Sequence, residues 1–444
     1  MKRKSFVSCL AGAFGGVSFA MTTPQVTDVQ MEQDASSHRV TISYTIDSPA
    51  IVTLSIETNT LPNGAGEWID IGAENLASLS GDVQTIMKTS GKKTICWKPT
   101  RSWPDQVIPD NRVRALIAAY SLDAPPDYLV VNLAKPSEKA FFATAKSIPD
   151  GIGNRRYKTD YLVLRKIPSA NVAWRMGSPI TEVNRDKWNE IPHRVTLSKD
   201  FYLGVYEVTQ AQFRRVMGSN PSYYAGAPDA DMRPVESATP NVFAGADNSN
   251  MADGSFVPPA TSFTGKLRLL AADGIAYTLP TEAQFEFACR AGSGSGLYTG
   301  KESTEGNLSA FAWHAGNWAQ DPVSVANGNC NQTHAVGQLL PNEFGLYDMI
   351  GNVREWMMDG PAQATAAEAL DPCDGTVSAG TRIMRGGSYV DAVPTAEQKD
   401  NFNLLRCASR ISGKWWGTTT TDPAFTAAEY AAHGFRVACP ADFR

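Results

Sequence analysis

The spacing of apolar side chains changes partway along this 444-residue chain. In the first part, apolar and polar residues alternate, as in Val40–Ile46 and Val52–Ile56. Such alternation buries one face of a β-strand and leaves the other face polar. Turn-forming residues separate these runs, and no long helical period interrupts them. We therefore predict that residues 24–133 form an all-β sandwich, which we interpret as an immunoglobulin or fibronectin-like module.

Residues 161–444 show a different pattern, in which helix starts are followed by a long loop-rich stretch. Thr209–Gln212 and Thr281–Gln284 each have the spacing of a capping box, which satisfies the first backbone N–H groups of a helix. Gly218 and Gly292 indicate where the two helices end. Beyond Gly292 the sequence is dense in Gly, Asn, Trp and Pro. This composition predicts a loop-rich domain that needs ions, disulfides or side-chain networks to order its backbone.

Other segments indicate how the chain is organised and where it works. Residues 134–160, with several Pro and Gly, are predicted to be a linker. Residues 1–20 are predicted to be a signal peptide with cleavage near Ala20, because basic residues precede a short apolar run that ends in a small-x-small site. We therefore expect export, to the periplasm or outside the cell.

No later apolar run approaches the roughly 20 residues that span a bilayer. The net charge of −5 leaves no basic surface for nucleic acid.

Seven short motifs of the second domain occur in the order typical of one known family. They are MGSP (176–179), PHRVTLSKDFYLGVYEVTQAQF (192–213), RPVE (233–236), LPTEAQFEFACRAG (279–292), PNEFGLYDMIGNVREW (341–356), RGGSY (385–389) and GFR (434–436). On these motifs the chain resembles the formylglycine-generating-enzyme, or sulfatase-modifying-factor, family from Tyr161 onward. The resemblance implies that family's fold, an elaborated, loop-rich, C-type-lectin-like α+β domain behind the β sandwich.

The copper ligands of the family are missing. The family includes copper oxidases that convert a sulfatase cysteine to formylglycine, and two thiolates hold their copper. Here Asp391 stands at the first thiol position, and no cysteine follows it before Cys407. Copper(I) requires soft ligands that carboxylates do not replace, so we do not expect copper. The tryptophan that lines the oxidase site is Arg354, whereas Ser388 and Tyr389 keep the family's residues, either beside the site or in the core network.

Calcium is the one ion that the resemblance supports. The implied ligands are the Asp348 side chain, the Gly351 and Val353 carbonyls, and Glu355. Hard oxygen ligands of this kind suit calcium. Without the resemblance, Asp348 would be interpreted as a turn cap and Glu355 as a solvated carboxylate.

Further metal sites have weaker support. A second calcium position implied by the resemblance would begin at Asn317 and Trp318, but its downstream carboxylate is absent. The family's iron-dependent sulfoxide synthases assemble three histidines mostly from a separate helical domain, whereas the N-terminal domain here is predicted to be β. The five histidines show no HxxxH spacing, so we do not expect iron.

The resemblance also implies a disulfide between Cys289 and Cys407. Such a bridge would close a long loop and constrain the unfolded chain. The alternative is two separate buried thiols, each acting as a small apolar residue. The pairing of Cys96, Cys330, Cys373 and Cys439 stays open.

Two functions are compatible with these patterns. In the first, the protein is a family member without copper oxidase activity, a calcium-stabilised module that binds a protein, peptide or glycan. Trp415, Trp416 and Tyr430 are suited to contact such a ligand, or else belong to the core. In the second, it is a metal-dependent oxidase or sulfatase-maturation-type enzyme that acts on a peptide or small thiol. The absent thiol pair favours the first function.

Overall fold

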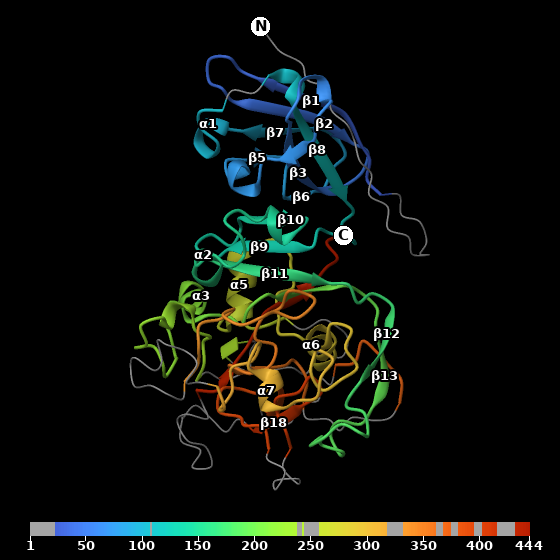
Figure 1. Cartoon of the computed structure of the whole chain (residues 1–444), viewed down its shortest axis with the longest axis vertical. Helices are drawn as coiled ribbons and strands as arrows, with labels where there is room; N and C mark the ends of the chain where they lie inside the picture. Colours follow the sequence, from blue (N-terminus) through green and yellow to red (C-terminus); the bar gives the residue numbers. More distant parts are fainter. Residues whose placement is uncertain are drawn as a thin grey trace. The chain divides into compact units, whose positions relative to one another are not determined.

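The structure is a computed structural model of the whole chain (Figure 1). It describes residues 23–106, 109–237, 242–243, 257–317, 332–360, 367–373, 381–394, 402–414 and 431–444. The predicted signal peptide, the position Trp318, and the proposed contact residues Trp415, Trp416 and Tyr430 lie outside these ranges. The chain divides into two compact units, each of which is described separately below.

The first unit contains two β-sheets around a common core (Figure 1). One sheet has the order β1-β2-β7-β5, and the other has the order β4-β3-β6 with β8 beside β3. The strands are β1 (Val26–Gln33), β2 (Val40–Ile46), β3 (Ala50–Asn59), β4 (Trp68–Asp70), β5 (Ser80–Gly81), β6 (Ile86–Met87), β7 (Gly91–Trp97), β8 (Val113–Tyr120) and β10 (Lys139–Phe142). The short helices are η1 (Pro62–Gly64), η2 (Ala73–Leu76), α1 (Pro99–Ser102), η3 (Asp110–Arg112) and η4 (Ala145–Ser147).

The alternation seen in the sequence becomes the buried face of this core. Ile42 and Tyr44 of β2 and Val52 and Ile56 of β3 are buried, whereas the residues between those of β2 are only half-buried. The all-β prediction for this region therefore agrees with the observed sheets. The assignment to an immunoglobulin or fibronectin-like module stays a prediction.

The last residues of the chain, Ala441–Arg444, belong to the first unit, which the sequence did not indicate. The Phe443 backbone N–H donates to the Leu122 carbonyl at 2.8 Å, and its ring meets Phe141 edge to face at 5.4 Å. The predicted linker, 134–160, is also more structured than expected, because it contains β10, η4 and the short helix α2 (Arg156–Thr159). The division between the units runs through β9 (Tyr128–Asn132).

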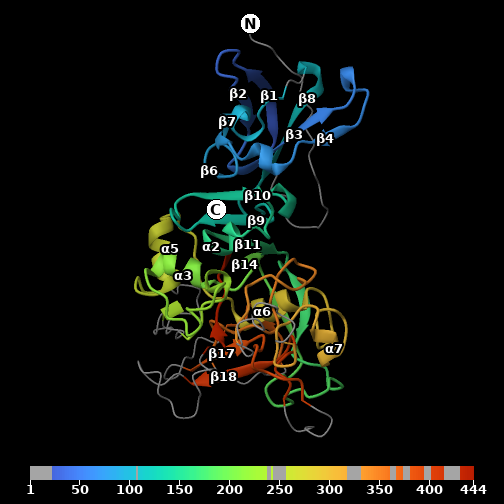
Figure 2. The same ribbon diagram turned by 60° about the vertical axis from the view of Figure 1, so that its left-hand side comes forward.

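The second unit combines small sheets with short helices (Figure 2). Its sheets include the strand orders β11-β14-β20, β12-β13-β16 and β18-β17-β15-β19. The strands are β11 (Tyr161–Ile167), β12 (Val172–Met176), β13 (His193–Leu197), β14 (Phe201–Gly204), β15 (Arg354–Trp356), β16 (Ala369–Leu370), β17 (Thr381–Arg385), β18 (Arg410–Lys414), β19 (His433–Gly434) and β20 (Ala438–Pro440). The helices are α2 (Arg156–Thr159), α3 (Gln210–Met217), η5 (Ala230–Met232), α5 (Phe263–Ala271), α6 (Glu282–Arg290) and α7 (Glu305–Leu308).

Both predicted helix starts are confirmed. Thr209 caps α3 and Thr281 caps α6, and each belongs to a complete capping box. Helix α3 ends at Gly218, whose φ of 81° costs a glycine little. Helix α6 ends one residue before the predicted Gly292, because Ala291 already takes the left-handed conformation. No described helix has the length and apolarity that crossing a bilayer requires.

Buried ion pairs order the loops of the second unit. We define the α6 ion network as Glu282, Glu286, Arg290 and Arg385. Glu286 accepts from Arg290 Nε and from Arg385 Nη1, both at 2.8 Å, and Arg385 Nε donates to Glu282 at 2.8 Å. Burial alone would raise the pKa of Glu286, but the two guanidinium groups outweigh it and lower that pKa. These ion pairs supply the side-chain network that the loop-rich sequence required.

A second buried pair joins segments that are far apart in the chain. Arg406 donates to Glu182 at 2.5 Å and to Glu190 at 2.7 and 2.9 Å, and all three side chains are at most 3% exposed. A guanidinium binds carboxylates in a fixed planar geometry, so these contacts also orient the loops that carry them.

Candidate functional site

Asp391 is the centre of a polar cluster just after the RGGSY motif. Its carboxylate accepts from Arg354 Nε at 3.1 Å and, more closely, from Arg354 Nη2. The Ser388 backbone N–H and hydroxyl also donate to it, both at 2.8 Å. Four donors thus engage the Asp391 carboxylate, three at Oδ2 and one at Oδ1. With His433, these residues are called the Asp391 cluster below.

The sheet β18-β17-β15-β19 positions this cluster. Arg354 opens β15 and lies in register with His433 of the parallel strand β19. After β17 the chain turns at Gly387, whose φ is 68° and whose added Cβ would lie 2.9 Å from the Leu404 carbonyl oxygen. Only glycine fits this turn without strain, and the turn brings Ser388 to Asp391.

His433 is a member of the cluster that sequence reasoning missed. Arg354 Nη1 lies 3.4 Å from His433 Nε2, and the imidazole meets the Trp356 ring at 5.7 Å. Burial, followed by the Arg354 charge, lowers the pKa of His433 to about 3. The ring is therefore neutral near pH 7. Its place directly before the GFR motif was the one available signal.

Tyr389 links the cluster to a second group of polar residues. Its hydroxyl lies 3.1 Å from the Tyr224 hydroxyl, and burial, with the bond to Tyr224, raises the Tyr389 pKa. The Tyr224 backbone N–H donates to Glu236 at 3.0 Å. Next to it, the Tyr223 ring stacks edge to face on Tyr224 and is 62% exposed. Ser388 is thus hydrogen-bonded within the Asp391 cluster, whereas Tyr389 is hydrogen-bonded to Tyr224 in the core network. Tyr223 adds an exposed aromatic ring beside these residues.

The predicted calcium ligands Asp348 and Glu355 lie in a buried acidic group that also contains Glu207. Burial first, and then the neighbouring carboxylates, raise the pKa of Glu207 well above its usual range. Burial also raises the pKa of Asp348 and of Glu355. The cations that offset these carboxylates include Arg436 and Lys158. The negative surplus is electrostatically suited to a cation.

The geometry of this group, however, is not that of the predicted four-ligand site. Both Glu355 oxygens accept from Arg436, at 2.6 and 2.7 Å, and one Asp348 oxygen accepts from the Gly337 N–H at 2.7 Å. The Val353 N–H donates to Glu207 at 3.1 Å. Within the described ranges, no group of three or more His, Cys, Asp or Glu side chains is arranged to hold a metal ion. The oxygen donors of this group fit calcium chemically, but both Glu355 oxygens are already bonded to Arg436.

The second predicted calcium position is used inside a turn. The Asn317 side-chain oxygen accepts from the His314 N–H at 2.8 Å, and its amide nitrogen donates to the Ala312 carbonyl at 2.7 Å. Asn317 is 1% exposed. Its amide therefore stabilises a local turn, and its role as a ligand stays a prediction.

Cys289 and Cys407 are both buried in the same core cluster. Burial, followed by a hydrogen bond with Cys407, raises the pKa of the Cys289 thiol well above its usual range. The structure has both as free thiols, without the bond between them that the resemblance implies. The sulfur atoms are thus neighbours, and the disulfide stays a prediction.

Comparisons with known proteins cover most of the second unit. Residues 171–417 match the family model described as a sulfatase-modifying factor enzyme 1-like domain. The chaperone protein LppX of Paenibacillus barcinonensis is 34% identical over 223 residues, which are 46% of this chain and 74% of that protein. The formylglycine-generating enzyme of Mus musculus is 25% identical over 273 residues, 55% of this chain and 70% of that enzyme.

One solved structure is also similar. Treponema denticola variable protein 1 aligns with 63% of this chain and 95% of its own, at 23% identity and a TM-score of 0.45.

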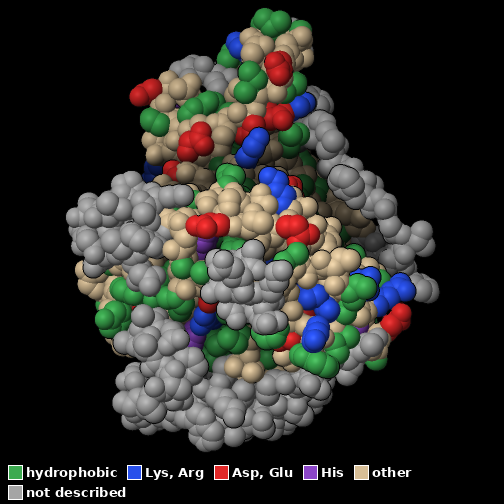
Figure 3. All heavy atoms as spheres, turned by 60° about the horizontal axis from the view of Figure 1, so that its bottom comes forward, with side chains coloured by type: hydrophobic (Ala, Val, Ile, Leu, Met, Phe, Trp, Pro, Cys, Tyr) green, Lys and Arg blue, Asp and Glu red, His purple; other side chains and the backbone are tan. Residues whose placement is uncertain are grey.

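On the face drawn in Figure 3, the described Lys and Arg side chains are interspersed with Asp and Glu rather than gathered in one broad basic area. This agrees with the net charge of −5.

Proposed function

Because the chain belongs to the family of proteins with a sulfatase-modifying factor enzyme 1-like domain, we propose that it is an exported binding module and not a copper oxidase. Its ligand is a protein, peptide or glycan. The observation that carries this proposal is the state of Asp391. The position that a copper thiolate would occupy holds a carboxylate whose oxygens are used by Arg354 and Ser388.

Two features support the proposal that no thiolate copper centre of the family's kind forms at this place. Copper(I) needs soft sulfur ligands, and residues 389–406 contain no cysteine. Asp391 and Arg354 compensate each other's charge, so the Asp391 carboxylate already has a cationic partner. The cluster instead presents a guanidinium and a carboxylate whose side chains are 10 and 11% exposed.

Two observations support a binding role. The exposed Tyr223 ring lies on Tyr224, which is bonded to Tyr389, so an aromatic contact surface adjoins the polar network. Tyrosine provides a large contact area at a low cost in conformational entropy. The relative from P. barcinonensis is named a chaperone protein, which favours a protein ligand.

Calcium is part of the same proposal, as a stabilising ion near Asp348. Calcium should raise the melting temperature of the chelator-treated protein, because a cation offsets the repulsion among the buried carboxylates. Asp348→Asn should abolish the calcium-dependent shift. An equal shift in the variant and the unaltered protein would place calcium elsewhere, and no shift would remove calcium from the proposal.

The test of the redox part is metal content together with oxygen consumption. The purified protein is loaded with copper, dialysed and measured by mass spectrometry, and dioxygen uptake is followed with a cysteine-containing peptide. We expect no retained copper and no uptake. One copper per chain with thiol-dependent uptake would support the metal-dependent oxidase instead.

The binding part needs its own measurement. Peptide and glycan arrays are probed with the unaltered protein, with Arg354→Ala and with Tyr223→Ala. We expect a ligand whose binding falls in both variants. A ligand that binds all three proteins equally would show that the Asp391 cluster is not the binding site.

A further inference from the structure

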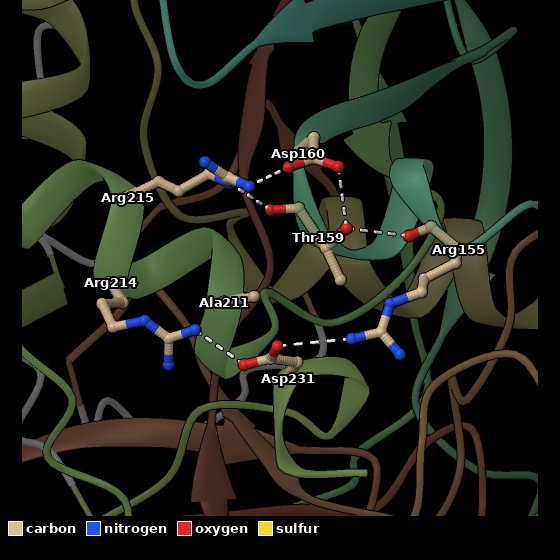
Figure 4. Close-up of a pocket in the computed structure, with 7 residues that line it drawn as sticks. All are labelled: Arg155, Thr159, Asp160, Ala211, Arg214, Arg215 and Asp231. Atoms are coloured by element: carbon tan, nitrogen blue, oxygen red, sulfur yellow. Dashed lines mark hydrogen bonds and ion pairs between the residues drawn. The ribbon is translucent and has the colours of Figure 1, made fainter.

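A polar cavity of about 410 Å³ lies among α2, α3 and η5 of the second unit (Figure 4). It shares no lining residue with the Asp391 cluster. The charged groups that line it are Arg155, Arg214, Arg215, Asp160 and Asp231. Arg214 and Arg215 lie in the last turn of α3, where a positive charge is favoured by the helix dipole.

Both carboxylates of this cavity are already engaged. Asp231 bridges two arginines, because its Oδ1 accepts from Arg214 Nη2 at 2.6 Å and its Oδ2 from Arg155 Nη2 at 3.3 Å. Asp160 Oδ1 is bonded to Arg215 Nη2, and its Oδ2 accepts from the Thr159 hydroxyl at 3.1 Å. Figure 4 shows these contacts around the cavity. Each carboxylate oxygen thus has a donor.

The arginines, by contrast, keep unused donors. Within the part of the chain that the structure describes, Nε and Nη1 of Arg155 and of Arg214 make no hydrogen bond, and Nη1 of Arg215 makes none either. The three side chains are 61, 48 and 40% exposed, so a solute can reach them. The cavity therefore offers several N–H donors.

The charges define the chemistry that complements these donors. Three guanidinium groups face two carboxylates, which leaves a surplus of one positive charge in a chain whose net charge is −5. Planar guanidinium groups bind oxyanions through paired N–H donors. A cavity of this volume is large enough for a small organic molecule.

We propose that this cavity binds a singly charged oxyanion, the carboxylate or sulfate ester of a small molecule, through Arg155 and Arg214. The site is independent of the proposed function at Asp391. Because the arginines are partly exposed, binding should weaken with salt over the roughly 10 Å screening length at 0.1 M.

The experiment is titration calorimetry at low salt with glucuronate, glucose 6-sulfate and neutral glucose. We expect one or both anions to bind and glucose not to bind, and the stronger anion identifies the oxyanion. Binding of glucose equal to that of the anions, or no binding by either anion, would overturn the proposal.

Variants give effects of opposite sign. Arg214→Ala should weaken binding about tenfold, as expected when one charge-assisted contact is lost. Asp231→Asn should strengthen binding severalfold, because it removes a competing negative charge. The matched control is Arg194→Ala, which breaks another exposed pair, Arg194–Glu368, with side chains 63 and 76% exposed. Equal losses of anion affinity in Arg214→Ala and Arg194→Ala would refute the site. Weaker anion binding by Asp231→Asn, with an unchanged melting temperature, would also refute it.

Discussion

Arg354 and Glu355 are consecutive residues of β15, yet their ion pairs lie in different surroundings. Glu355 pairs with Arg436, and these side chains are 1 and 0% exposed. Arg354 pairs with Asp391, and these are 10 and 11% exposed. Successive side chains of a strand point to opposite faces, so one strand serves both the interior and the Asp391 cluster. The comparison teaches that consecutive residues of one strand can join a fully buried ion pair and one that is slightly open to solvent.

The strongest test of this contrast is Glu286→Gln in the α6 ion network. The amide would remove the carboxylate bonded to Arg290 and one of the two carboxylates bonded to Arg385 in the interior. We expect a loss of about 3 to 5 kcal/mol in the free energy of unfolding, measured by denaturant titration. Arg194→Ala is the exposed control, with an expected change below about 1 kcal/mol. Equal effects of the two substitutions would contradict the structural role of the buried network.

A disulfide between Cys289 and Cys407 would strengthen the same scaffold. In protein exported to an oxidising compartment, Cys407→Ser should then cost about 2 to 4 kcal/mol, because the unfolded chain loses its constraint. Peptide mapping under non-reducing conditions should show the linked pair. If both cysteines are alkylated without prior reduction, the disulfide is absent and the substitution should have only a packing effect.

The pH dependence of stability tests the cluster through His433. Its pKa is lowered from 6.5 to about 3 in the folded protein, so between these values the unfolded chain binds a proton that the folded chain does not. Stability from this residue is therefore present above pH 6.5 and is lost as the pH falls. Lowering the pH from 7 to 5 should cost about 2 kcal/mol through His433.

The measurement is denaturant unfolding at both pH values, for the unaltered protein and for His433→Gln. The variant should lose this part of the pH dependence and keep the part due to carboxylates. If both proteins show the same pH dependence, the His433 ring is protonated at pH 5 in the folded protein as it is in the unfolded chain.

Among the substitutions of buried or partly buried groups, the smallest stability change is expected for Asp391→Asn. This substitution is the same change of carboxylate to amide as Glu286→Gln, but it occurs where water can reach Arg354. We expect a loss of about 1 kcal/mol, together with reduced ligand binding. A loss as large as that of Glu286→Gln would show that the cluster is part of the scaffold, and the binding proposal would then lose its main support.

Local patterns predicted much of the fold but only part of the site. The capping boxes at Thr209 and Thr281 occur as predicted, because each depends on neighbouring residues. The replacement of a copper thiol by Asp391 stays a prediction from the family resemblance. His433 and Glu207 were not predicted, since each joins its group through long-range contacts.

The sequence by itself determined the alternating strands of the first unit, the helix starts, the family and the absence of cysteine from residues 389–406. Short-range spacing and residue identity are sufficient for these. The tertiary structure alone decided which charges meet: Arg406 pairs with Glu182 across 224 positions, and Arg354 meets Asp391 across 37. The physical reason is that a buried charge must find a compensating partner in space, and packing, not distance along the chain, determines which partner is within reach.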